Sequence, residues 1–139
     1  MPHLGPLALG LAGLCLFAGT CRGDDLFEFE GLKPGLVVRY ADAAHSTTRI
    51  EPAVAAIWGS AAPLPGIDAA SFQAEWSGVL FVKSDTKYRF YVHGQGRVRV
   101  RIADQEVLSG EATEPGWIAG PPTPLEFGFL PLQITFAKT

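Results

Sequence analysis

Cysteine is almost absent from this 139-residue chain, and its position is informative. The two cysteines, Cys15 and Cys21, both lie within the first 23 residues. An apolar run over residues 4–19 is shorter than the roughly 20 residues of a membrane span, and small residues precede a cut after Gly23. Residues 1–23 are therefore predicted to be a secretory signal peptide. No Lys or Arg precedes the apolar run, so an uncleaved anchor and a misassigned start or buried segment remain alternatives.

Loss of this leader would leave a domain without cysteine, which no disulfide could stabilise. Roughly 116 residues would remain, enough to form a hydrophobic core by packing alone. Hydrophobic residues make up 47% of the chain and aromatic residues 11%, which supports such a core. Charged residues are scarce at 18%, which disfavours disorder.

An excess of positive charge is also missing. The net charge of the whole chain is −3, and removal of Arg22 with the leader leaves ten basic and fourteen acidic residues. This balance argues against nucleic acid as a partner. The composition indicates one domain over residues 35–139 after an acidic segment over residues 24–34, with membrane contact expected only through the leader.

Motifs for catalysis or metal binding are missing too. His45 and His93 lack a second ligand at metal spacing, and His3 lies in the leader. The sequence contains no nucleophile elbow, phosphate-binding loop or dinucleotide fingerprint, and no Cys-x-x-Cys-His motif for haem. We expect a protein that is not an enzyme and that carries no metal or cofactor.

A period-two alternation of apolar and polar residues dominates residues 72–108. Three runs within it predict an antiparallel meander with one buried face, with turns at residues 84–86 and 93–96. In the third run Val98, Val100 and Ile102 alternate with three arginines, so the valines and the isoleucine should be buried. Gly78 in the first run indicates a bulge or a close approach of another segment, and we expect a bend there.

Further strands are predicted on both sides of the meander, over residues 36–40, 125–129 and 132–136. Residues 52–58 fit one or two helical turns or a strand. Residues 109–124 are rich in Gly and Pro, which predicts a long loop and excludes a central strand. Trp58 and Trp76 are expected in the core. About seven short strands and hardly any helix favour an all-β antiparallel sandwich or partly closed barrel.

The strand sequences resemble the PA14 domain family, a β-sandwich module of exported proteins, adhesins and glycosidases. The resemblance covers about residues 35–139 and rests on FQAEWSGVL over residues 72–80, YRFYV over 88–92, RVRI over 99–102 followed by Asp104 and Val107, and LQITF over 132–136. It implies a secreted or periplasmic, non-catalytic module that binds carbohydrate at the cell envelope. The family usually continues into a further closing strand, so the resemblance also implies that the last strand is lacking here and that the chain is a fragment of a larger exported protein.

One departure from the family bears on calcium. Sugar-binding members carry an acidic pair after the Tyr-x-Phe-Tyr strand, and calcium bound there contacts sugar hydroxyls. The corresponding residues here are Gln95 and Gly96. Because a calcium site needs six to eight oxygen ligands, several of them carboxylates, we expect no calcium at this place.

Five residues are candidates for ligand binding. Arg97, Arg99 and Arg101 form a stripe that could hold sulfated or carboxylated glycans, or a solvated face paired with Glu75, Glu106 or other carboxylates. Trp117 could stack on a sugar ring, with Gln95 nearby, or fold back with Ile118 as a plug over the sheet. The alternatives to glycan binding are a structural spacer, a module that binds an adjoining domain or protein, and an accessory domain for an enzyme acting in trans.

Overall fold

The computed structural model describes residues 7–8, 32–55, 58 and 60–138, so most of the predicted leader and of the acidic segment lies outside the described residues. The described residues form strands and connecting segments without any helix. None of them therefore forms a helix long and apolar enough to cross a membrane.

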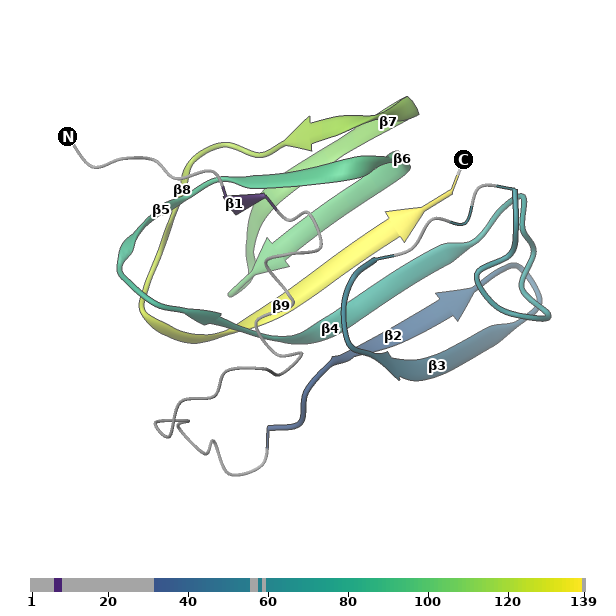
Figure 1. Ribbon diagram of the computed structural model, residues 1–139, viewed down its shortest axis with the longest axis horizontal. Coiled ribbons are helices and arrows are strands. Elements are labelled where there is room, and N and C mark those ends of the chain that lie inside the picture. The colour runs from purple at the N-terminus through teal and green to yellow at the C-terminus, as the bar shows by residue number, and fades with distance from the viewer. Residues whose placement is uncertain (1–6, 9–31, 56–57, 59, 139) are drawn as a thin grey trace.

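The described residues form nine strands (Figure 1). They are β1 (Leu7–Ala8), β2 (Leu36–Ala41), β3 (Ser46–Glu51), β4 (Gln73–Val82), β5 (Thr86–Tyr88), β6 (Phe90–Ile102), β7 (Gln105–Ala119), β8 (Thr123–Leu125) and β9 (Gly128–Ala137). The long strands pair antiparallel in the order β7, β6, β9, β4, β2, β3. Strand β1 lies parallel to the start of β6, and β5 and β8 form a small second sheet. The predicted all-β, sandwich-like architecture is confirmed, without a closed barrel.

The predicted meander over residues 72–108 is wrong, because β9 lies between β4 and β6. Strands β6 and β7 form one long hairpin, which corrects two further predictions. The predicted turn at residues 93–96 is an irregularity within β6, and most of the predicted loop at residues 109–124 belongs to β7. Gly94 faces Gly116 and Gly96 faces Ala112, so residues 113–115 stand opposite Gln95 alone. Pro115 lies in this bulge, where no ladder hydrogen bond is required of it. No other strand of the described part pairs with β7, which agrees with the exclusion of a central strand.

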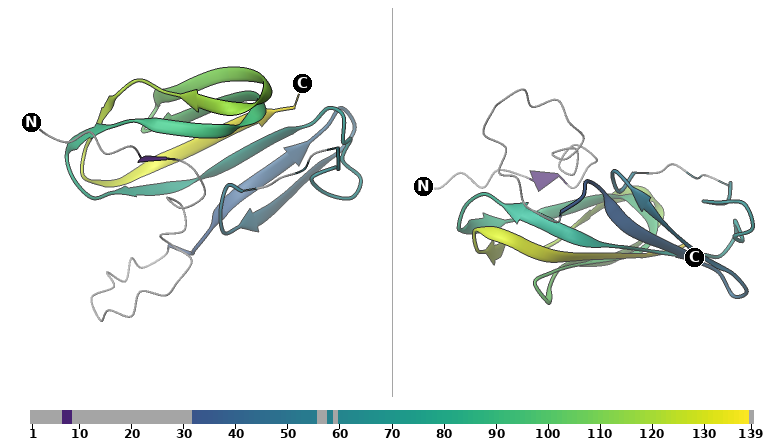
Figure 2. Two further views of the ribbon diagram at one scale, coloured as in Figure 1. Left: turned by 45° about the horizontal axis from the view of Figure 1, so that its top comes forward. Right: turned by 90° about the horizontal axis from the view of Figure 1, so that it is seen from below.

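At this bulge the hairpin folds back on itself and supplies both layers of the sandwich (Figure 2). The backbone at Gly96 has φ of +121°, and a Cβ there would lie 2.6 Å from the carbonyl oxygen of Ala137. A Cβ on Gly110 would lie 2.6 Å from Cγ2 of Ile118, eight residues further along the same strand. The two halves of β7 therefore face each other across the core.

The end of the chain also differs from the prediction. The two strands expected over residues 125–129 and 132–136 are replaced by the short β8 and by β9, which runs uninterrupted through Pro131. The ladder between β9 and β6 ends at Leu132, and the Pro131 carbonyl accepts a hydrogen bond from Ala103 N at 2.9 Å. The missing N–H of Pro131 points to this same side, beyond the end of the ladder, so no ladder hydrogen bond is lost.

The bend predicted at Gly78 is absent. Strand β4 pairs with β9 in unbroken register from Gln73 to Val82. Glycine instead makes room for the Leu36 side chain, since a Cβ at Gly78 would lie 2.4 Å from Cδ2 of Leu36. The helical turns considered for residues 52–58 do not form in the part that is described, while residues 56 and 57 lie outside it.

The core confirms the alternation read from the sequence. Val98, Val100 and Ile102 are at most 4% exposed. Trp76 is buried, and Trp58 is partly buried against the core, as expected for both. Edge and tilted contacts join five aromatic rings at one end of the core, those of Tyr40, Trp58, Phe72, Trp76 and Phe136.

Candidate functional site

The arginine stripe lies on the outer face of the main sheet. Pairing registers place Arg99 in one row that crosses six strands, formed by Ser109, Arg99, Thr135, Glu75, Arg39 and Thr48. Side chains in such a row are neighbours because residues paired across strands share a face. The sheet therefore brings together polar residues from β7, β6, β9, β4, β2 and β3.

Each arginine of the stripe has a partner. Arg97 Nη2 lies 3.2 Å from Glu111 Oε2, and Arg99 Nε lies 3.0 Å from Glu106 Oε2. Arg101 Nη2 donates to the backbone carbonyl of Asp104 at 3.2 Å. These pairs are solvent-exposed, so each contributes at most about 1 kcal/mol to stability. The arginines of the stripe are therefore paired with neighbouring groups and exposed to solvent. This arrangement is one of the two that the sequence analysis considered for the stripe.

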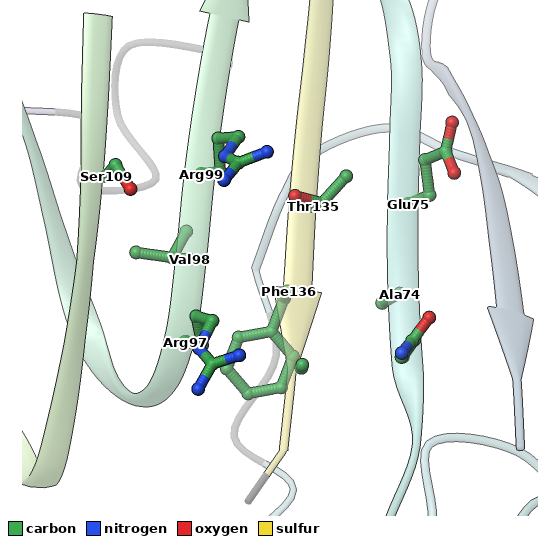
Figure 3. A pocket seen from close by; sticks show the side chains of 10 residues that line it. Ala74, Glu75, Arg97, Val98, Arg99, Ser109, Thr135 and Phe136 are labelled. Carbon is green, nitrogen blue, oxygen red and sulfur yellow. The ribbon is translucent and has the colours of Figure 1, made fainter. Parts of the chain in front are cut away.

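A shallow groove runs along β9 on this face, with a volume of about 270 Å³. Short side chains on β9, Thr135 and Ala137, form its floor. Longer side chains form its walls: Arg97 and Arg99 on β6, and Gln73 and Glu75 on β4. Figure 3 shows the two guanidinium groups on one side of Thr135 and the Glu75 carboxylate on the other.

Trp117 lies on a different face from the stripe. It faces His93 across the β6–β7 ladder, in edge contact with ring centroids 5.0 Å apart. Trp117 is 62% exposed, whereas its neighbour Ile118 packs against the core. The segment therefore folds back over the sheet with Ile118 on the core, as one alternative expected, but the Trp117 indole does not take part in this covering. Because the hairpin folds back at its bulge, Trp117 and the arginines point away from the core in opposite directions.

Gln95 occupies the bulge between these two surfaces. Its side-chain amide donates to the Thr113 carbonyl at 2.8 Å, which ties the two strands together where the ladder is interrupted. Gly96 beside it is buried against Phe136. Within the described residues no group of three or more His, Cys, Asp or Glu side chains is placed to hold a metal ion.

A cluster of side chains around one carboxylate, that of Glu51, lies at the aromatic end of the core and was not predicted from the sequence. The Glu51 side chain is 13% exposed and accepts hydrogen bonds from Tyr40 Oη at 2.9 Å and Trp76 Nε1 at 3.3 Å. Arg49 Nε donates to the same carboxylate at 2.7 Å, and its guanidinium lies 5.6 Å from the centre of the Tyr40 ring. Burial and the Glu51 carboxylate raise the pKa of Tyr40, and Glu51 raises the pKa of Arg49. The Tyr40 hydroxyl and the Trp76 indole N–H are both matched by Glu51, so the cluster anchors β3 to the core.

Asp42 makes local hydrogen bonds in the turn between β2 and β3. Its Oδ1 accepts from the backbone N–H groups of Ala44 and His45, and its Oδ2 accepts from Asp68 N at 2.8 Å. These three N–H groups lower the pKa of Asp42 to about 2. The residue thereby joins the β2–β3 turn to the loop before β4. This link could not be predicted from the sequence, because the two segments are far apart in the chain.

Similar folds occur in larger proteins. An anti-sigma factor domain-containing protein is 21% identical with a TM-score of 0.65, covering 75% of this chain and 38% of its own. A second one, from Clostridium clariflavum, is 20% identical with a TM-score of 0.65 over 76% of this chain and 37% of its own. The GH31 alpha-xylosidase of Xanthomonas citri is 17% identical with a TM-score of 0.59 over 75% of this chain and 12% of its own.

These solved structures support the fold alone, and this chain spans well under half the length of each. No curated protein sequence matches the chain. A sequence model of the PA14 domain matches residues 32–124, a range that contains β2 to β7 and the aromatic and arginine motifs quoted above. The chain therefore belongs to the PA14 domain family.

Proposed function

We propose that the protein is a non-catalytic carbohydrate-binding module of the cell envelope. The observation that carries this proposal is Trp117, which presents a 62% exposed indole from a paired strand. Stacking against an indole suits the C–H face of a sugar ring, because the aromatic brings a large apolar area and loses little rotamer entropy. The edge contact with His93 braces the ring.

Polar groups near the indole would supply orientation. The His93 imidazole lies beside it, and Gln95 is two residues further along β6, with its amide nitrogen fixed by the Thr113 carbonyl. Fixing that nitrogen sets the direction of the amide oxygen, which can accept a hydrogen bond from a sugar hydroxyl. Since Gln95 and Gly96 offer no carboxylate, the proposed binding does not require calcium.

Family membership supports two other parts of the proposal, namely the lack of catalysis and the location at the cell envelope. PA14 domains are generally non-catalytic and typically occur in extracellular or envelope proteins. The predicted leader over residues 1–23 would direct export. A second function, a spacer or protein-binding module, is favoured by the larger proteins in which similar folds take up 38% and 12% of the chain. Such a module would need the packed core but not the exposed indole.

Glycan-array binding of the full chain, with and without calcium, identifies the sugar and separates the two functions. Titration of the best glycan, followed by calorimetry, then compares Trp117→Ala with Trp117→Phe, which keeps an aromatic face. We expect the alanine variant to bind at least about tenfold more weakly and the phenylalanine variant to bind within a few-fold of the parent. Ile50→Ala is a matched control, since Ile50 is 65% exposed on β3, away from the hairpin bulge.

Two outcomes would contradict carbohydrate binding at Trp117. One is an array without any bound glycan, which would favour the spacer or protein-binding module. The other is a Trp117→Ala variant that binds as tightly as the parent protein.

A further inference from the structure

We propose that the groove over β9 is a second ligand-binding site, and that it takes a neutral, hydroxyl-rich ligand of about one sugar ring. It is lined by Gln73, Glu75, Arg97, Arg99 and Thr135. The site lies on the opposite face from Trp117 and does not depend on the function proposed for that residue.

The groove follows from the order of the strands. Strand β9 lies between β6 and β4, so their outward side chains stand on both sides of it, about 9.5 Å apart at two strand spacings. Thr135 and Ala137 on β9 are short, while their cross-strand neighbours Arg99, Arg97, Glu75 and Gln73 are long. A volume of about 270 Å³ lies just below the roughly 300–1,000 Å³ of drug-sized ligand sites, so one small ring fits.

Donors and acceptors remain available along the walls. Arg99 uses Nε for Glu106, which leaves the N–H groups of both terminal nitrogens, and Arg97 uses Nε and Nη2 for Glu111, which leaves Nη1. Glu75 Oε1 accepts from Gln133 Nε2 at 2.9 Å, which holds the carboxylate in place and leaves Oε2 open. Among the described residues, the Thr135 hydroxyl and the Gln73 amide make no side-chain hydrogen bond. Sugar hydroxyls both donate and accept, and so match this mixed set.

The local charge argues against an anionic ligand. The two guanidinium groups of the groove face Glu75 across it and pair with Glu106 and Glu111 on β7, while Arg39 is the cross-strand neighbour of Glu75. Three positive charges therefore stand against three negative ones, and no net positive charge attracts an anion. A sulfated or carboxylated glycan would have to displace these carboxylates or approach them closely. The arginines keep N–H groups beyond those used by their partners, and these can donate to neutral hydroxyl oxygens.

The test is a titration of the ¹⁵N-labelled full chain, followed by NMR, with methyl glycosides of glucose, galactose and mannose. Glucuronic acid and glycine serve as the acidic and zwitterionic probes. We expect saturable shifts of the Glu75, Arg99 and Thr135 amides with at least one neutral glycoside, unaffected by added salt. The acidic and zwitterionic probes should bind more weakly.

Variants locate the site. Thr135→Tyr fills the groove and should abolish the shifts, and Glu75→Ala removes an acceptor and should weaken binding at least about tenfold. Arg101→Ala is the matched control, because Arg101 belongs to the same stripe and lies outside the groove. It should bind within about twofold of the parent, as should Trp117→Ala.

Three results would overturn the proposal. They are the absence of saturable groove shifts with every neutral glycoside at tens of millimolar, tighter binding of glucuronic acid or glycine, and an unchanged affinity in Glu75→Ala. If glycan binding at Trp117 is refuted, the groove shifts should still be observed. The two proposed sites can therefore be refuted independently of each other. If Thr135→Tyr does not fold, Glu75→Ala still decides the outcome.

Discussion

The backbone of Gly120 lies directly against the backbone of Val107, so that a Cβ on the glycine would be 2.0 Å from the valine carbonyl oxygen. Gly120 N also donates to the Phe90 carbonyl at 2.9 Å, which fixes the end of the hairpin in this position. The two layers of the sandwich therefore meet backbone to backbone at a residue without a side chain.

Gly120→Ala should lower the free energy of unfolding by about 2 kcal/mol or more, because the obstructing atoms belong to the backbone and cannot rotate away. Gly116→Ala is the matched control, since its added Cβ would meet nothing closer than the Glu114 carbonyl oxygen at 3.8 Å. Urea denaturation of both variants is the measurement. Equal stability of the two would contradict the described packing.

Trp76→Ala should lower the free energy of unfolding by about 3–5 kcal/mol. The indole is 3% exposed and contacts Tyr40 and Trp58, so its removal leaves a cavity and takes one of two hydrogen-bond donors from Glu51 Oε2. Thermal and urea denaturation measure the loss. A cooperatively melting variant with the parental melting temperature would refute the assignment of Trp76 to the core.

Stability should fall at alkaline pH because of Tyr40. Its pKa is raised in the folded protein, so the unfolded chain ionises first, above about pH 10, and folding is penalised as the pH rises further. Tyr40→Phe cannot ionise and should lack this loss, although it is less stable at neutral pH without the hydrogen bond to Glu51. Urea denaturation from pH 8 to 11 compares the two, and parallel curves would contradict the raised pKa.

Asp42 should stabilise the fold above about pH 4. Its pKa is lowered from 3.8 to about 2, so its contribution is complete above the higher value and is lost as the pH falls through the lower one. Asp42→Asn keeps one oxygen for Ala44 and His45 but turns an amide toward Asp68 N, where two donors then meet. The melting temperature of the parent should exceed that of the variant at pH 7, and this difference should shrink toward pH 2.

Alternation predicted the buried and exposed faces of the strands because it depends only on neighbouring residues. Val98, Val100 and Ile102 are buried where it placed them, and the arginines between them are exposed. Glycine and proline were misleading for a physical reason. Gly94, Gly96 and Pro115 are typical of turns, yet here they build a bulge that bends a continuous hairpin.

The candidate groove could not be predicted, because it depends on strand order. Thr135 lies between Arg99 and Glu75, and these three residues come from strands far apart in the chain. Nothing in their spacing indicates that β9 inserts between β6 and β4. Trp117 could be singled out as a candidate from its type, but only the position of the bulge decides which surface it occupies.

The insertion of β9 also sets an order of assembly. Strands β2, β3 and β4 form one group and β6 with β7 another, and among the strands that the structure describes only β9 joins the two. During synthesis β4 and β6 would both present unpaired backbone edges until residues 128–137 leave the ribosome. A nascent chain that stalls before residue 128 is thus expected to be the aggregation-prone species of this protein.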